Sequence, residues 1–129
     1  MDVLARDVTL AALTASQSAL TKRLSLLAQN IANVNTPDYK RRDITFTEEL
    51  AEALGQPVSG RDERAARVGG VVAREVVEEQ LFYRADQGGI DIDREMVELA
   101  KAQVKGMVLQ QLVYKKIRQY RSVIRDGRI

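Results

Sequence analysis

Apolar residues recur every three or four positions near the beginning of the chain, and this spacing constrains the fold more than any other feature. The series begins at Leu10 and ends at Val34, and Gln17 is the residue that interrupts it. Steps of three and four return to the same side of an α-helix, so the spacing predicts one long amphipathic helix over residues 5–34. We expect its seam to comprise Leu10, Leu13, Leu20, Leu24, Leu27, Ile31 and Val34.

A second long helix is predicted over residues 93–126, and either Asp91 or Asp93 can cap its first turn. One apolar stripe runs along it, and a second apolar line, which includes Val97, Met107 and Val108, widens the face through the first half. A helix that is apolar over so wide an arc is expected to contact more than one neighbour. We expect the seam to comprise Met96, Leu99, Val104, Leu109, Val113, Ile117, Tyr120 and Ile124.

The segment after the first helix predicts a turn. Pro37 cannot continue a helical hydrogen-bond ladder and pushes Thr36 into an extended conformation, so the helix should end between Asn33 and Asn35. Pro37 suits the second position of a β-turn, and Asp38 after it favours type I, although aspartate also tolerates the left-handed conformation of type II. Residues 44–54 then indicate an extended entry into a short helix.

The middle of the chain has a different composition. Residues 55–70 contain four glycines, a proline and the charged run Arg61–Arg64, so we predict a mobile surface loop there. The β-branched residues between Val71 and Phe82 favour a short strand. We therefore divide one structural unit into residues 1–54, a variable segment 55–89 and residues 90–129. The predicted fold is mainly α, with two long antiparallel terminal helices in a coiled-coil-like pair and a short loop- and β-rich middle segment.

The predicted helix length implies an elongated molecule that assembles with others. Each helix of about 30 residues is about 45 Å long, whereas a compact globule of this size has a diameter of about 35 Å. The seam of one helix alone does not offset the conformational entropy that its ordering costs, so neither helix is expected to be stable by itself. An antiparallel pair buries one seam of each helix and leaves the second apolar line for other molecules.

Composition excludes most familiar active sites. The chain has no cysteine and no histidine, which removes thiolate nucleophiles, disulfides, the usual zinc ligands and the side chain that titrates nearest neutral pH. A hydrolase with paired carboxylates stays open in principle, and Glu48 or Glu95 would have to be essential for it, but no motif supports it. We expect no enzymatic activity and no cofactor.

The end of the first helix carries a motif that resembles a known family. The segment from Asn30 to Lys40, followed by Arg42 and Asp43, is similar to the signature of bacterial flagellar rod, hook and related axial proteins, and the stretch 84–96 is most similar to proximal-rod subunits. Asp38 stands where the family pattern usually has Gly, and residues 87–89 stand where it has an Asn pair. The resemblance assigns the motif and turn to Asn30, Ala32, Asn33, Asn35, Thr36, Pro37, Tyr39, Lys40, Arg42 and Asp43.

The resemblance implies a function and a setting. It implies a structural subunit of the flagellar basal-body rod that polymerises through its terminal helices to form part of the drive shaft. The implied partners are other copies of the chain, other rod proteins, the rod-base adaptor protein and the flagellar export gate. The implied location is the periplasmic rod, reached by type III export without a cleaved signal peptide, and the first 30 residues lack the apolar core of such a peptide. No direct membrane insertion is expected.

A second interpretation belongs to a different class of protein. The segment from Lys115 to Arg128 is basic and would suit a helical adaptor or nucleic-acid-binding module. We favour the simpler explanation that cations stabilise the negative end of a helix, and that these residues spread around its circumference. The net charge of only +2 agrees with this, so we expect no nucleic-acid partner.

Overall fold

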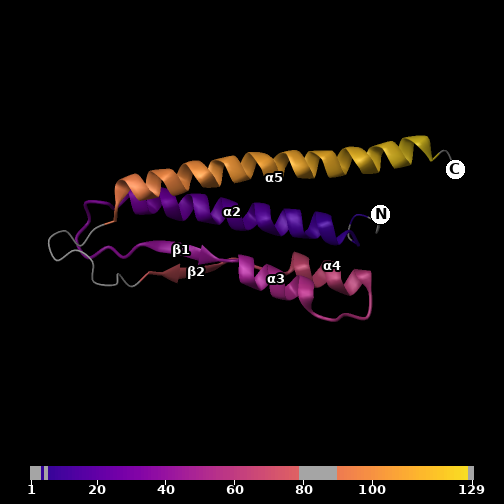
Figure 1. Cartoon of the computed structure of the whole chain (residues 1–129), viewed down its shortest axis with the longest axis horizontal. Helices are drawn as coiled ribbons and strands as arrows, with labels where there is room; N and C mark the ends of the chain where they lie inside the picture. The colour runs from indigo at the N-terminus through magenta and orange to yellow at the C-terminus, as the bar shows by residue number, and fades with distance from the viewer. Residues whose placement is uncertain (1–3, 5, 79–89, 128–129) are drawn as a thin grey trace.

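The computed structural model describes residues 4, 6–78 and 90–127. It is an elongated, mainly helical molecule in three layers (Figure 1), with α5 on one side, α2 in the centre and a β-ribbon with two short helices on the other side. Helix α2 (Val8–Ala32) and helix α5 (Ile92–Asp126) run antiparallel side by side. The two long terminal helices predicted from apolar spacing are confirmed. Of the stretch 84–96, which resembles proximal-rod subunits, residues 84–89 lie outside the described part.

Both long helices begin at aspartate caps. Asp7 accepts hydrogen bonds through Oδ1 from the backbone N–H groups of Thr9 at 2.8 Å and Leu10 at 3.0 Å. Asp91 caps α5 in the same way, and Asp93 lies within the first turn. These bonds satisfy backbone donors that have no partner inside the helix. Of the two caps proposed for the second helix, the structure selects Asp91.

The seam between α2 and α5 is built from leucines around one alanine. Leu20, Leu27 and Ala102 are buried together, and Leu24, Leu99 and Leu109 pack against them. Gly106 packs against Leu20 of α2, because a Cβ atom added there would lie 3.3 Å from Leu20 Cδ2. Small residues on α5 therefore let the two helices pack closely in the middle of the pair.

The middle segment begins with a short β-ribbon. Strand β1 (Arg42–Thr45) pairs antiparallel with strand β2 (Arg74–Val77), and Asp43 lies opposite Val76 in the register. Helix α3 (Thr47–Gly55) follows β1 directly. The predicted extended entry into a short helix over residues 44–54 is thereby confirmed, and so is a short strand after Val71.

The prediction of a loop over residues 55–70 is wrong. Helix α4 (Arg61–Gly69) occupies most of this segment and packs against α2. Its Ala65 and Val68 are three residues apart, hence on one side of the helix, and their exposed fractions are 2% and 0%. The charged run that suggested a loop lies on the solvent side, so two small apolar residues were sufficient to order the segment.

The turn after α2 also differs from the favoured prediction. Tyr39 N donates to Thr36 O at 3.4 Å, which closes the expected four-residue turn. Asp38 has a φ of 60°, which is the left-handed conformation required at the third position of a type II turn and not that of type I. The aspartate thus occupies the conformation that glycine adopts without steric cost.

Candidate assembly surface and the polar lock beneath it

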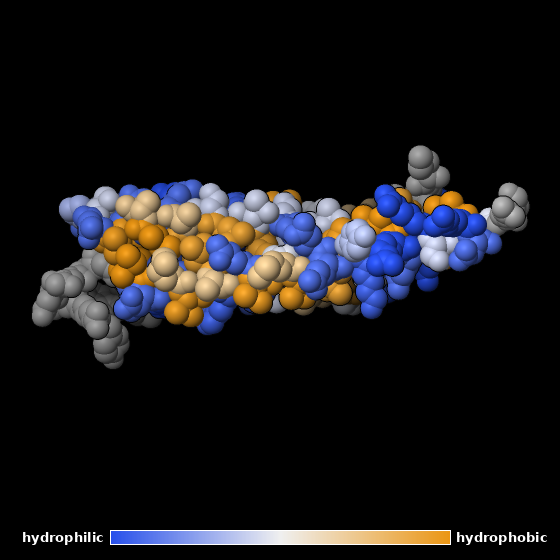
Figure 2. All heavy atoms as spheres, turned by 90° about the horizontal axis from the view of Figure 1, so that it is seen from above, coloured by the Kyte–Doolittle hydropathy of each residue, from blue (hydrophilic) through white to orange (hydrophobic). Residues whose placement is uncertain are grey.

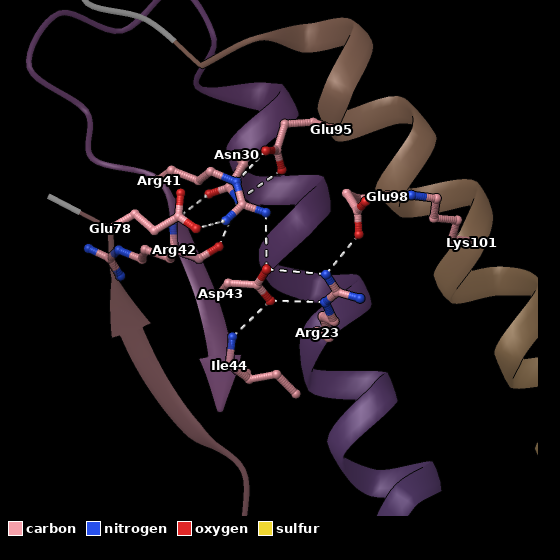
Figure 3. A network of polar contacts seen from close by, with 10 residues as sticks. All are labelled: Arg23, Asn30, Arg41, Arg42, Asp43, Ile44, Glu78, Glu95, Glu98 and Lys101. Atoms are coloured by element: carbon pink, nitrogen blue, oxygen red, sulfur yellow. Dashed lines mark hydrogen bonds and ion pairs between the residues drawn. The ribbon is translucent and has the colours of Figure 1, made fainter. Parts of the chain in front are cut away.

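The first asparagine of the motif, Asn30, is fully buried and joins three elements (Figure 3). Its Nδ2 donates to the backbone carbonyl of Arg42 at 2.8 Å and to Glu95 Oε2 at 3.1 Å, and its Oδ1 accepts from Arg42 N at 3.1 Å. One amide therefore substitutes for a strand partner of β1 and also holds the first turn of α5. A buried amide with all these partners fixes the direction in which the chain leaves α2.

Glu95 and Arg41 form a buried ion pair next to Asn30. Arg41 Nε donates to Glu95 Oε1, and the exposed fractions of the two side chains are 7% and 1%. Arg41 also contacts Asp43 Oδ2 at 3.0 Å and Glu78 Oε1 at 2.9 Å. Although desolvation lowers it, these carboxylates raise the pKa of Arg41 above its ordinary value. We call Asn30, Arg41 and Glu95 the polar lock.

A second arginine extends the polar lock along the helix pair. Arg23 on α2 donates to Asp43 at 2.9 Å and 3.3 Å and to Glu98 on α5 at 2.9 Å. Desolvation opposes it, but the hydrogen bonds from Arg23 and the Ile44 N–H hold the pKa of Asp43 below its usual value. Carboxylates of β1, of α5 and of Glu78 thus share two arginines. Separation of α5 from α2 would remove Glu98 from Arg23 and Glu95 from Arg41.

The rest of the motif is placed at one end of the molecule. Asn33 Nδ2 donates to the Gln29 carbonyl at 2.8 Å and so satisfies an acceptor in the last turn of α2. Asn33 Oδ1 accepts from the Thr36 hydroxyl at 3.1 Å. Tyr39 is half-buried, and Asp43 lies between Arg23 and Arg41. The remaining motif residues are exposed: Ala32, Asn35, Thr36, Pro37, Lys40 and Arg42.

A polar clasp fastens the opposite end of the helix pair. Asp7 Oδ2 accepts from the Tyr120 hydroxyl and contacts Lys116 Nζ at 2.9 Å. Desolvation raises the pKa of Asp7, but the hydrogen bonds from Tyr120 and Lys116 outweigh it and hold that pKa well below its ordinary value. The same bond raises the pKa of the Tyr120 hydroxyl. The carboxylate that caps α2 therefore also holds the second half of α5, and we call these three residues the clasp.

The side of α5 that faces away from α2 remains uncovered. At 100° per residue the buried side is defined by Glu95, Ala102 and Leu109, and the side opposite to it we call the outer face of α5. Every residue of the outer face is exposed: Asp93, Met96, Val97, Ala100, Gln103, Val104, Met107, Val108, Gln111, Tyr114, Lys115, Arg118, Arg121, Ser122, Arg125 and Asp126. Figure 2 shows that apolar side chains gather over the first half of this helix and hydrophilic ones over the second.

The first half of the outer face is strongly apolar. Met96, Val97, Val104, Met107 and Val108 expose 52%, 53%, 55%, 57% and 50% of their surfaces. Exposed apolar patches of this continuity mark interaction sites on soluble proteins. A groove borders the patch, in which Ala19 and Leu20 of α2 lie between Val104 on α5 and Phe46 before α3.

The second half of the outer face is basic. Lys116 turns inward to Asp7, but Lys115, Arg118, Arg121 and Arg125 lie on the outer face within one arc. The expectation that the basic residues spread around the helix is therefore wrong for these four. Arg118 lies over the ring of the exposed Tyr114, 5.8 Å from its centroid, so both side chains belong to the surface.

The structure divides the predicted seam residues into three groups. Leu20 and Leu27 are buried, whereas Met96, Val104, Ile117 and Ile124 are exposed. The remaining seam residues are partly buried: Leu10, Leu13, Leu24, Ile31, Val34, Leu99, Leu109, Val113 and Tyr120. Of these residues, Leu20, Leu24, Leu27, Leu99 and Leu109 pack in the core between the two helices, whereas Met96 and Val104 belong to the outer face.

The roles of Arg41 and Glu95 in the polar lock, of Arg23 beside it and of Asp7 in the clasp were not predicted from the sequence. Glu95 lies four residues after the α5 cap and seven before Ala102, so helical spacing places a carboxylate on the apolar seam. A charged residue on a buried stripe needs a partner of opposite charge, and this was the available signal. Within the described residues, no group of acidic side chains is placed to hold a metal ion.

Comparisons with known proteins agree on one family. The flagellar basal body rod protein FlgB of Salmonella typhimurium is 29% identical over 134 residues, which cover 91% of this chain and 95% of the relative. FlgB of Cereibacter sphaeroides is 40% identical over 84 residues, covering 64% of this chain and 62% of the relative. FlgB of Escherichia coli is 28% identical, with 91% and 95% covered. No protein-family model matches the chain.

Two further observations bear on the kind of protein. No helix in the part of the chain that the structure describes has both the length and the apolar character needed to span a membrane. The relatives are named as structural components of the flagellar rod and not as enzymes. With the motif from Asn30 to Lys40 and the long paired helices, these relatives support the FlgB family of flagellar basal body rod proteins as the family of this chain.

Proposed function

We propose that this rod subunit joins its neighbours in the proximal rod through its terminal helices, and that the outer face of α5 is the principal contact. The observation that carries the proposal is the apolar first half of that face, which α2 leaves uncovered. Its neighbours would be other copies of the chain, other rod proteins, the rod-base adaptor protein and the flagellar export gate. We place the subunit in the periplasmic part of the rod, reached by type III export without a cleaved signal peptide.

The size of the apolar surface supports assembly through several weak contacts. Covering five half-exposed Met and Val side chains stabilises a contact by roughly 4 to 8 kcal/mol. Association itself costs about 4 to 15 kcal/mol in lost translational and rotational freedom. One such contact is therefore marginal, whereas a subunit held by neighbours on more than one side is secure. The polar lock supports this role, because it holds the surface and the motif turn in one fixed relationship.

The proposal is tested by placing a charge in the apolar half of the outer face. Val108→Asp should leave the helix pair folded, because Val108 is already half-exposed, but should abolish swimming in a strain that lacks its own FlgB protein. Val72→Asp is the matched control, since Val72 is 73% exposed and lies after α4 on the other side of α2. Circular dichroism of both purified variants checks folding.

Cell fractionation distinguishes a defect in export from a defect in assembly. We expect the Val108→Asp protein outside the cytoplasm but absent from purified basal bodies, and the Val72→Asp protein in both. Normal swimming of the Val108→Asp strain would contradict the assignment of α5 as the principal contact. Retention of the variant in the cytoplasm would place the effect on export instead of assembly.

A further inference from the structure

The charges on the outer face of α5 select one way in which two copies of this chain can meet. The apolar half extends from Met96 to Val108, and the basic half with Lys115 and Arg118 follows it. Two copies that met through this face in parallel would bring four cations of one copy against the same four of the other. Like charges opposed in this way disfavour the contact. An antiparallel arrangement moves the two basic halves to opposite ends of the pair.

The antiparallel arrangement also pairs charges of opposite sign. Asp93 is the acidic residue at the start of the outer face, and it lies eleven positions before Val104, whereas Lys115 lies eleven positions after it. A two-fold axis at Val104 therefore places Asp93 of one copy next to Lys115 of the second copy, and the reverse at the other end. The same axis places residues 100–108 of one copy against residues 100–108 of the other, and Met96 of one copy against Leu112 of the other.

We propose that the free subunit forms an antiparallel dimer through the outer face of α5, with Val104 at its two-fold axis. An isologous contact of this kind closes on itself and generates no filament. The dimer is a state of the free protein and its existence does not depend on the proposed rod contact. It covers the apolar residues used in that contact, so neighbours in the rod would have to displace the second copy. Dimerisation thus hides the apolar half before assembly.

Cysteine cross-linking tests the arrangement directly, because the chain has no cysteine of its own. Val97 lies seven positions before Val104 and Gln111 lies seven after it, so the axis brings Val97 of one copy next to Gln111 of the second. We expect a mixture of the full-length Val97→Cys and Gln111→Cys proteins to form a mixed disulfide on mild oxidation. Either protein alone should form none, since its two sulfurs would be about 20 Å apart.

Three results of this experiment would overturn the proposal. Disulfide-linked dimers of Val97→Cys alone would indicate a parallel pair, and species larger than dimers in sedimentation velocity would indicate an open contact. A protein that stays monomeric up to about 1 mM, with no mixed disulfide, would show that the second copy does not occupy this face.

Charge reversal provides a second measurement that is independent of oxidation. Lys115→Glu or Asp93→Lys alone should raise the dimer dissociation constant by roughly 2- to 30-fold, and the double variant should restore it to near the wild-type value. Arg121→Glu is the control on the same face, beyond the reach of Asp93 in the second copy. Equal weakening by the control, or no restoration in the double variant, would overturn the pairing. Rod assembly is scored separately by swimming, so a failed dimer and a failed rod contact are distinguishable.

Discussion

Asn30 and Glu95 are 65 positions apart in the sequence, yet Asn30 Nδ2 lies 3.1 Å from Glu95 Oε2 inside the protein. Asn30 also holds both backbone groups of Arg42, and Glu95 holds the Arg41 guanidinium. The end of the N-terminal helix, the start of the C-terminal helix and the ribbon between them are therefore ordered together. The two bonds from Asn30 to Arg42 hold the ends of the motif turn, and Glu95 ties this arrangement to α5.

Removing the carboxylate of the polar lock should be costly. Glu95→Ala leaves the buried Arg41 without its principal partner, and we expect it to lower the free energy of unfolding by about 3 to 5 kcal/mol. The double variant Arg41→Met, Glu95→Leu leaves no buried charge unpaired, because Asp43 keeps Arg23 and Glu78 is exposed, and it should be less destabilised than Glu95→Ala. Urea unfolding followed by circular dichroism measures all three proteins. A double variant less stable than Glu95→Ala would show that the ion pair itself is essential to the fold.

The long helices were predictable from sequence because the apolar period and, for α5, the aspartate cap are local signals. The polar lock was not, because Asn30 and Glu95 become neighbours only through the antiparallel packing of distant segments. Helix α4 was missed for a related reason, since Ala65 and Val68 are too small a stripe to outweigh a charged composition until α2 supplies a surface. What sequence predicts well here is periodicity, and what it misses is tertiary pairing.

The clasp should make the stability of the protein depend on pH in the acid range. The pKa of Asp7 is lowered in the folded protein from an ordinary value of 3.8, so its contribution is complete above pH 3.8 and is lost as the pH falls toward the folded value. Asp7→Asn keeps a capping side chain but loses the charge. We expect it to be less stable than the wild type at pH 7, and the difference in urea midpoint to shrink progressively below about pH 4.

Two controls separate the clasp from general charge effects. Asp62→Asn removes an aspartate whose side chain is 62% exposed, so its effect on the urea midpoint should be small at every pH. Tyr120→Phe removes the hydroxyl that donates to Asp7. Because the pKa of Tyr120 is raised in the folded protein, the stability contributed by this hydrogen bond should be lost above pH 10 in the wild type and not in the variant. A constant difference between Asp7→Asn and the wild type from pH 7 to pH 3 would contradict the clasp.

The left-handed residue of the motif turn gives a third prediction. Asp38→Val places a β-branched side chain at a φ of 60° and should destabilise the protein by about 1 to 2 kcal/mol. Asp38→Gly relieves the steric cost but makes the unfolded chain more flexible, so we expect a change of less than about 1 kcal/mol. Thermal unfolding compares them. If Asp38→Val matched the wild type, the turn would not require this conformation in solution.

Gly106 packs against Leu20 where α2 and α5 meet. Its replacement by alanine and by valine should change the stability of the protein in opposite directions. A Cβ at this position lies 3.3 Å from Leu20 Cδ2, the flexible end of a side chain, so a small shift of Leu20 accommodates an alanine. Because glycine inside a helix is about 1 kcal/mol less favourable than alanine, we expect Gly106→Ala to be neutral or stabilising.

Gly106→Val adds two further methyl groups at the same point, where Leu20 cannot move far enough, and overpacking of this kind costs about 1 to 3 kcal/mol. The double variant Gly106→Val, Leu20→Ala creates space opposite the valine and should recover part of that loss, whereas Leu20→Ala alone should destabilise. Urea midpoints of the four proteins form a double-mutant cycle. An interaction energy near zero would mean that Gly106 and Leu20 do not touch in solution, and the close approach in the middle of the helix pair would have to be abandoned.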